Sequence, residues 1–386
     1  MKIQELKSAF ETTYGKATEA MYFAPGRVNL IGEHIDYNGG SVFPCALSFG
    51  TYLLVAENDK SVINFKSLNQ PEIISLGLDQ LTNPLYKSWV NYPLGVIAQF
   101  IKNCYEINVG FDLLFWGNVP NGAGLSSSAA LEVVTAYAFN DQLGAGFNRT
   151  ALAQIGQKAE HEFAYVNCGI MDQFAAANGA KNHAIHLNCD TLEFELVHIK
   201  LEGVKILISN THSPHKLDSG AYNLRVAECK KAVEQLNTVR PLRYLAELTE
   251  AEFKSIESAI TDPVAQKRAR HVVGEVQRTS DALKALKAGD LTLFGKLMNA
   301  SHVSLRDDYE VTGPELDCMA EEAWKIEGVI GSRMTGGGFG GCTVSLVKDE
   351  AIETFIKEVG VAYETKIGIK PEFYIAEIGD GVCKLS

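Results

Sequence analysis

The sequence predicts an α+β fold of two lobes, with mixed sheets and helices. The chain has 386 residues, which is more than one domain usually holds, so we expect two domains. In the first half, β-type runs such as 52–56 and 62–66 alternate with stretches of helical spacing such as 129–143. The stretch from about 222 to 300 is mainly helical. These observations predict mixed secondary structure throughout.

The remaining elements can be placed from their flanking residues. We expect a helix over 150–166 that is capped by Thr150. A short helix is predicted within 169–178. Further strands are expected at 111–117, 183–187, 194–199, 204–209 and 342–347. A boundary near residue 190 divides the chain into an N-terminal domain, 1–190, and a C-terminal domain, 191–386.

Charge and composition narrow the function classes. The net charge is −12, and so acidic a surface repels nucleic acid and anionic lipid, so we expect neither as a partner. A basic cluster at 267–271 is interpreted as a solvated helix face. No apolar run approaches the roughly 18 residues that span a bilayer, and the start carries no signal-peptide core. The eight cysteines are scattered without a Cys-x-x-Cys pair, which favours reduced thiols and a cytoplasmic location.

The segment 24–40 carries a dense set of polar side chains on a glycine-containing loop. Arg27, Glu33, His34 and Asp36 lie within ten residues of one another. Carboxylates and an imidazole in this arrangement can bind adjacent hydroxyl groups of a sugar. An ordinary solvated surface loop is the alternative interpretation.

The segment 120–130, PNGAGLSSSAA, precedes a predicted helix. Small residues expose backbone N–H groups, and the positive end of the helix faces the loop, a combination that binds phosphate. Serines also cap helices, so capping is the alternative. A P-loop requires Gly-Lys-Ser/Thr, which the sequence does not contain, so any kinase activity needs another scaffold.

The segment 334–342, MTGGGFGGC, matches G-x-G-x-x-G and raises a dinucleotide-binding alternative. That fingerprint requires a helix after the glycines, whereas residues 342–347 are of β type. A tight glycine turn that packs on another loop explains the segment better.

Asp172 falls in the first turn of the short helix, where the helix dipole stabilises its negative charge. A first-turn aspartate is usually structural, so a catalytic role remains the less common interpretation. Glu160, on the preceding helix, can face the same cleft.

These segments, in this order, resemble the GHMP kinase superfamily and within it the galactokinase family. Residues 26–37 resemble the galactokinase signature, 120–130 the phosphate loop and 335–342 the third motif of the superfamily, and 301–310 a further galactokinase segment. The resemblance runs from about residue 23 to residue 373. It implies a two-lobed GHMP kinase fold with the active site between the lobes.

The resemblance also implies an activity and a set of site residues. The activity is transfer of the γ-phosphate of ATP to the C1 hydroxyl of α-D-galactose in the Leloir pathway, with ATP and Mg²⁺ required. The implied galactose contacts are Glu33, His34, Ile35, Asp36, Gly169, Asp172 and Tyr222. The implied ATP contacts are Gly122, Ala123, Gly124, Leu125, Ser126, Ser127 and Ser128, with Trp89 on the adenine, and the implied magnesium ligands are Ser128 and Glu160.

The chain departs from the family pattern at two positions. Ile35 stands where threonine is commoner, and Leu224 stands where an arginine often follows the tyrosine, which weakens the assignment of Tyr222. For the chemistry, we hypothesise that Asp172 accepts the C1 hydroxyl proton and that Arg27 keeps Asp172 ionised. A non-catalytic sugar and ATP sensor, or a kinase for N-acetylgalactosamine, remain alternatives.

Overall fold

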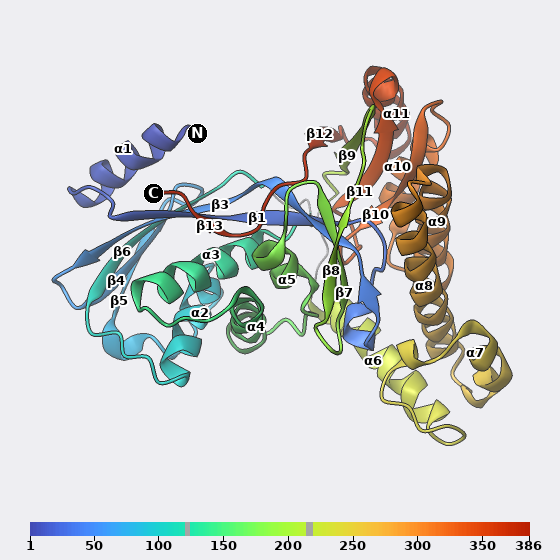
Figure 1. Cartoon of the computed structure of the whole chain (residues 1–386), viewed down its shortest axis with the longest axis horizontal. Helices are drawn as coiled ribbons and strands as arrows, with labels where there is room; N and C mark the ends of the chain where they lie inside the picture. The colour runs from blue at the N-terminus through green and yellow to red at the C-terminus, as the bar shows by residue number, and fades with distance from the viewer. Residues whose placement is uncertain (120–123, 214–218) are drawn as a thin grey trace.

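The structure is a computed structural model that describes residues 1–119, 124–213 and 219–386. Two lobes lie side by side, the first around a six-stranded sheet and the second around a four-stranded sheet, with a three-stranded sheet between them (Figure 1). In the residues described, every helix is too short or too polar to cross a membrane. The predicted two-lobed α+β fold is confirmed.

The sheet of the first lobe has the order β13–β1–β3–β6–β4–β5, and β4 and β6 pair in parallel. Its strands are β1 (Ala20–Asn29), β3 (Pro44–Asn58), β4 (Val62–Ser67), β5 (Ile73–Gly77), β6 (Gly110–Gly117) and β13 (Cys383–Lys384). One face is covered by α2 (Asn91–Lys102), α3 (Ser127–Gln142), α4 (Arg149–Ala159) and α5 (Met171–Asn178). The other face carries α1 (Ile3–Tyr14) (Figure 1).

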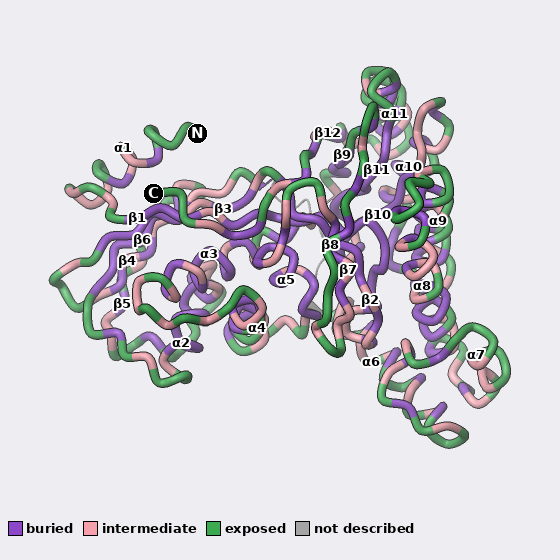
Figure 2. The backbone as a smooth tube through the Cα atoms, in the orientation of Figure 1, coloured by how far each residue is buried: buried purple, intermediate pink, exposed green. Residues whose placement is uncertain are grey.

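Both faces of this sheet are therefore buried, which explains the continuous apolar run in β3. Successive side chains of a strand point to opposite faces. Leu53 and Val55 pack in the core beneath the four helices, whereas Leu54 packs with Leu6 and Phe10 of α1. Figure 2 shows the resulting band of buried residues along the sheet.

The second lobe has the antiparallel sheet order β10–β11–β9–β12. Its strands are β9 (Val204–Asn210), β10 (Val329–Thr335), β11 (Cys342–Lys348) and β12 (Glu372–Ala376). Its helices are α6 (Ser219–Leu236), α7 (Glu250–Ile256), α8 (Pro263–Ala288), α9 (Leu291–Ser304), α10 (Gly313–Ala323) and α11 (Ile352–Ile367). The sheet between the lobes joins β2 (Ser41–Val42), β7 (His183–Asn188) and β8 (Phe194–His198).

The predicted helix over 150–166 is present, but its predicted cap is wrong and its last turn is π-helical. The cap is Asn148, which has extended backbone angles and accepts a hydrogen bond from the N–H of Ala151 at 2.9 Å, whereas Thr150 already lies inside the helix. Regular α-helix ends at Ala159 and continues as a π-helical turn, Glu160–Ala164. Because such turns change the direction of side chains, they are frequent at functional sites.

The domain boundary near residue 190 falls in the turn that joins β7 to β8. The chain also returns to the first lobe at its end, where β13 pairs with β1 (Figure 1). The division into 1–190 and 191–386 therefore stays a prediction, with the last residues of the second segment in the first lobe's sheet.

The interpretation of residues 267–271 as a solvated helix face is wrong for three of them, Arg268, Ala269 and His271, which are buried. Arg268 is 2% exposed, and its guanidinium donates to Glu228 at 2.8 Å, to Glu310 at 2.8 Å and to the carbonyl of Asp308 at 2.6 Å. His271 is fully buried as well. The reason is that α6 and the π-helical turn Leu305–Tyr309 pack over this part of α8, which local sequence does not reveal.

Replacing Arg268 by alanine should lower the free energy of unfolding by about 3 kcal/mol, because two carboxylates and a carbonyl lose their buried cationic partner. Chemical denaturation of the purified protein measures this loss. The matched control is Lys267→Ala, whose ion pair with Glu310 is about half exposed and should contribute less than ~1 kcal/mol. Equal losses in the two variants would contradict a structural role for the buried arginine.

Candidate active site

A cavity of about 340 Å³ opens where the loop after β1, the start of α3, the start of α5 and the turn between β10 and β11 meet. Thirteen of the residues singled out in the sequence line it: Arg27, Glu33, His34, Asp36, Gly124, Leu125, Ser126, Ser127, Ser128, Glu160, Gly169, Asp172 and Tyr222. The segments come from distant parts of the chain, so the fold brings them together.

Arg27 and Asp172 form the central contact of the cavity. The guanidinium Nε and Nη2 donate to the two carboxylate oxygens of Asp172, each at 2.7 Å, and Nη1 donates to the carbonyl of Gly124 at 2.8 Å. Arg27 is 4% exposed, whereas the side chain of Asp172 is 28% exposed and so reaches the cavity. A bidentate pair of this kind fixes the position and orientation of the carboxylate.

Ser126 does not cap α3, although it occupies the position before the helix. Its φ is +60°, its side chain makes no capping bond, and its hydroxyl donates instead to Asp172 at 2.5 Å. Ser127 and Ser128, in the first turn, also line the cavity. The positive end of α3 therefore faces the same space as the carboxylate of Asp172.

Asp36, Gly169 and Tyr222 form the wall opposite α3. A Cβ atom at Gly169 would lie 1.8 Å from the carboxylate of Asp36, so only glycine permits this approach. Burial, together with the negative charge of Asp172, raises the pKa of Asp36 to about 7. The ring of Tyr222 lies 5.7 Å from that of His34.

The departure at Leu224 does not disturb Tyr222. Leu224 is 53% exposed, whereas Arg225 is buried and donates to the backbone carbonyls of Tyr309 and Glu310, each at 2.8 Å. Arg225 therefore anchors α6, and the position that lacks the family's arginine faces solvent.

Glu33 is 1% exposed and its carboxylate is held from three sides. It accepts from the side chain of Asn29 at 2.8 Å, from the N–H of Gly336 at 2.8 Å and from Arg333 at 3.3 Å. Sequence reasoning missed Arg333, which is fully buried. The sequence does contain a signal for Arg333, which is a charged residue in a β-type run directly before the glycine turn. A cation in such a buried strand needs a partner, so its presence indicates a buried ion pair.

Glu160 lies at the start of the π-helical turn, and Ser128 donates a hydrogen bond to it. Burial, together with the negative charge of Asp172, raises the pKa of Glu160 to about 7. The side-chain amide of Gln173 donates to Glu160 at 2.6 Å and to the fully buried Glu132 at 2.9 Å. Sequence reasoning missed Glu132 and Gln173; the signal for Glu132 was one charged residue in an apolar helical run.

The glycine turn between β10 and β11 is flanked by strands on both sides, so it is not a dinucleotide-binding fingerprint. Gly336, Gly338, Gly340 and Gly341 all have positive φ values, and a Cβ at Gly338 would lie 2.3 Å from the carbonyl of Val311. The prediction of a tight turn packed against another loop is confirmed.

Two of the predicted site residues, Ile35 and Trp89, lie outside the lining of this cavity, and two more are not among the described residues. The side chain of Ile35 is fully buried in the hydrophobic core that extends through both lobes, and it does not line the cavity. Trp89 lines an adjoining cavity of about 700 Å³ with Tyr86 and Tyr165, and Tyr92 borders both cavities. Gly122 and Ala123 fall outside the described residues.

Three family models match the chain. The galactokinase galactose-binding signature matches residues 8–57, the GHMP kinases N terminal domain residues 91–180, and the GHMP kinases C terminal domain residues 282–363. Together they cover the loop after β1, the start of α3 and the glycine turn.

Similar proteins match over their whole length. The galactokinase of Clostridium beijerinckii is 49% identical over 99% of both chains, and that of Streptococcus mutans is 47% identical over all of both. The crystal structure of Lactococcus lactis galactokinase complexed with galactose superposes with a TM-score of 0.97 at 43% identity, covering 99% of this chain and 100% of that one. The mevalonate kinase of Methanococcus jannaschii, at a TM-score of 0.66 and 19% identity over 94% of this chain and 99% of its own, shares the fold. The chain therefore belongs to the galactokinase family of ATP-dependent sugar kinases, which have the GHMP kinase fold.

Proposed function

We propose that this protein transfers the γ-phosphoryl group of ATP to the C1 hydroxyl of α-D-galactose, giving galactose 1-phosphate and ADP. The observation that carries the proposal is the bidentate Arg27–Asp172 pair beside the start of α3. Phosphoryl transfer needs alignment and charge stabilisation more than covalent chemistry, and this cavity offers both. Full-length identity to galactokinases supports galactose as the acceptor.

In this proposal Asp172 accepts the proton of the C1 hydroxyl while Arg27 holds the carboxylate ionised and in register. Ser126 fixes the second carboxylate oxygen. The N–H groups at the start of α3, with Ser127 and Ser128, cradle the phosphates, and the phosphate loop extends to Gly122 and Ala123. The charge of Arg27 also offsets the negative charge of the transferring group.

Replacing Asp172 by asparagine keeps the shape of the side chain and removes its charge. We expect kcat to fall by about 100-fold or more, the usual contribution of a positioned general base. A coupled assay for ADP release with galactose measures this.

Asp281→Asn, on the exposed face of α8, is the matched control and should leave turnover unchanged. Turnover within a few-fold of the parent protein in Asp172→Asn would remove Asp172 from the base role.

The sugar side of the cavity is assigned to Glu33, His34, Asp36, Gly169, Asp172 and Tyr222, with Ile35 supporting the loop from its core side. Asp36 allows a specific prediction, because an ionised carboxylate accepts hydrogen bonds from hydroxyl groups better than a neutral carboxyl group does. With a pKa raised to about 7, Asp36 is largely protonated at pH 6 and ionised at pH 8.

Galactose should therefore bind roughly tenfold more weakly at pH 6 than at pH 8, since about one tenth of a group with this pKa is ionised at pH 6. Calorimetric titration with galactose alone measures the effect without contributions from nucleotide or metal. Asp36→Asn should bind weakly at both pH values. A parent protein whose galactose affinity does not change with pH would contradict this assignment.

Ser128 and Glu160 are proposed to hold Mg²⁺. One carboxylate and one hydroxyl beside the start of α3 suit a cation that prefers oxygen ligands and keeps waters and substrate phosphates around it. When bound, Mg²⁺ supplies positive charge to the phosphate groups. Ser128 and Gln173 orient the carboxylate of Glu160 for this role.

Glu160→Gln should raise the Mg²⁺ concentration for half-maximal activity by about tenfold or more, because a charged ligand is lost. Galactose affinity without nucleotide should stay within about twofold of the parent value. Glu162→Gln, a partly exposed glutamate paired with Lys102, is the matched control. An unchanged Mg²⁺ requirement in Glu160→Gln would exclude Glu160 as a ligand.

The adenine ring is proposed to enter the adjoining cavity against Trp89. This cavity meets the first at Tyr92, which lets one nucleotide extend through both. Trp89 also packs edge-on against Phe115 at 5.7 Å, so its orientation is fixed by the core.

A non-catalytic sugar and ATP sensor would need the binding residues alone. The ordered contact among Arg27, Asp172 and Ser126 favours catalysis over sensing. A panel of sugars that includes N-acetylgalactosamine, tested for ADP release, distinguishes a galactose kinase, an N-acetylgalactosamine kinase and a non-catalytic sensor. We further propose a cytoplasmic location and the division into domains 1–190 and 191–386.

A further inference from the structure

A chain of hydrogen-bonding side chains lies beneath the sugar side of the cavity. Cys229 contacts the hydroxyl of Tyr309 at 3.1 Å, and that hydroxyl contacts the hydroxyl of Tyr37 at 2.7 Å. Tyr37 in turn contacts Nδ1 of His34 at 2.8 Å, and Nε2 of His34 contacts the carbonyl of Gly337 at 3.2 Å. This hydrogen-bond chain thus links α6, the π-helical turn Leu305–Tyr309, the loop after β1 (the sugar loop, residues 30–40) and the glycine turn.

The direction of every hydrogen bond in this chain follows from its last member. A carbonyl oxygen only accepts, so Nε2 of His34 carries the proton that points at Gly337. In a neutral imidazole Nδ1 then accepts, so Tyr37 donates to it. Each hydroxyl has one proton, so Tyr309 donates to Tyr37 and Cys229 donates to Tyr309.

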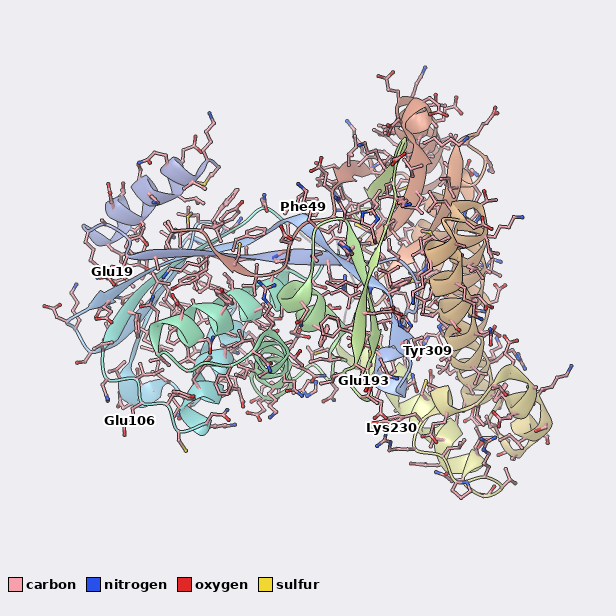
Figure 3. All side chains as sticks on the ribbon, viewed as in Figure 1. Glu19, Phe49, Glu106, Glu193, Lys230 and Tyr309 are labelled. Atoms are coloured by element: carbon pink, nitrogen blue, oxygen red, sulfur yellow. The ribbon has the colours of Figure 1, made fainter. Side chains whose placement is uncertain are left out.

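Most of this hydrogen-bond chain is buried, and Tyr37 is partly exposed. Tyr309 is fully buried, Cys229 is 1% exposed and His34 is 4% exposed. Burial, with the nearby His271 and Arg225, lowers the pKa of His34 to about 3. Figure 3 labels Tyr309 where the loop after β1 meets the helices of the second lobe.

The His34 end of this hydrogen-bond chain contacts the glycine turn, which helps to shape the cavity. Gly336 and Gly337 line the cavity, and the N–H of Gly336 donates to Glu33. The opposite tautomer of His34 would place the lone pair of Nε2 against the carbonyl oxygen of Gly337, which is repulsive. The Nε2–H tautomer of His34 therefore adds to the Gly336–Glu33 hydrogen bond in holding the glycine turn close to the loop after β1.

We propose that Tyr37 and Tyr309 are positioning residues that fix His34 as the neutral Nε2–H tautomer and so hold the glycine turn in place for sugar binding. They act through His34 and set the affinity for galactose, not the rate of phosphoryl transfer. The identity of the sugar as galactose rests on the proposed function, whereas the tautomer of His34 does not.

Tyr37→Phe removes the donor to His34 and leaves Nδ1 buried without a partner. We expect the KM for galactose to rise by about tenfold or more, while kcat and the KM for ATP stay within about threefold. In Tyr309→Phe, Tyr37 can still donate, so the KM for galactose should rise by only about two- to threefold. The increase in the KM for galactose should therefore be smaller for residues that lie farther from His34 along the hydrogen-bond chain.

Tyr105→Phe is the matched control. Its hydroxyl donates to the carbonyl of Ala145 at 2.9 Å in the first lobe, outside the residues that line the cavity. Removing that bond should lower thermal stability and leave the KM for galactose unchanged. A Tyr37→Phe variant that only loses stability, as Tyr105→Phe does, would overturn the proposal.

The ring nitrogens of His34 give a readout independent of activity. In ¹⁵N-labelled protein, with the His34 signals identified by their loss in His34→Gln, we expect a protonated Nε2 and an unprotonated Nδ1, and a mixture of tautomers in Tyr37→Phe. A protonated Nδ1 in the parent protein would overturn the proposal. If the parent protein released no ADP with galactose, the proposed function would fail, and the tautomer measurement would still decide the positioning role.

Discussion

Arg27 and Asp172 lie 145 residues apart in the chain, and their two hydrogen bonds tie the end of β1 to the start of α5. Removing both charges from water is costly, and only good geometry with further hydrogen bonds repays the cost. Here the carboxylate receives two guanidinium bonds and a hydroxyl bond, and the guanidinium also binds the carbonyl of Gly124. The loop before α3 is thereby fixed to the same pair, so the phosphate side and the sugar side of the cavity share one anchor.

A second buried charge joins the sugar loop to the second lobe. Arg333 reaches Glu33 and the carbonyl of Asn29, and within the described residues its Nε and Nη2 have no hydrogen-bond partner. Glu275 accepts from the N–H of Gly32 at 2.9 Å. Although burial opposes it, the charges of Arg278, His271 and Arg333 lower the pKa of Glu275 to about 2. The sugar loop is therefore held by ionic groups from α8 and β10 that do not line the cavity.

The sequence indicates the Arg27–Asp172 pair more clearly than it indicates the contacts of Arg333 and Glu275. Local pattern located the strand at 111–117, the helix at 129–143 and the three glycine-containing segments, because periodicity and turn residues act over a few positions. Glu275 and Arg333 lie 243 and about 300 residues from their partners in the sugar loop, and nothing near them in the chain marks the contact. The burial of Arg268 has the same origin, since the elements that cover it come from α6 and the turn after α9. Family resemblance and chemical reasoning predict the pairing of Arg27 with Asp172, whereas the spacing of the two residues in the sequence does not.

The balance of charge in the cavity connects these anchors to the chemistry. Four carboxylates line it, those of Glu33, Asp36, Glu160 and Asp172, and among the described lining residues Arg27 is the one permanent cation. Burial and mutual repulsion raise the pKa of Asp36 and of Glu160 to about 7, which reduces the negative charge of the empty cavity. Under the proposed function, a nucleotide triphosphate alone would add to that charge and be repelled, whereas the same nucleotide with the divalent cation proposed at Glu160 would favour the ionised form of Glu160. The neutral sugar would meet no such barrier, because in the proposed function its hydroxyl groups donate hydrogen bonds to Asp36 and Asp172. Under the proposed function, ATP would therefore bind this acidic protein where the start of α3, Arg27 and a metal cation act together.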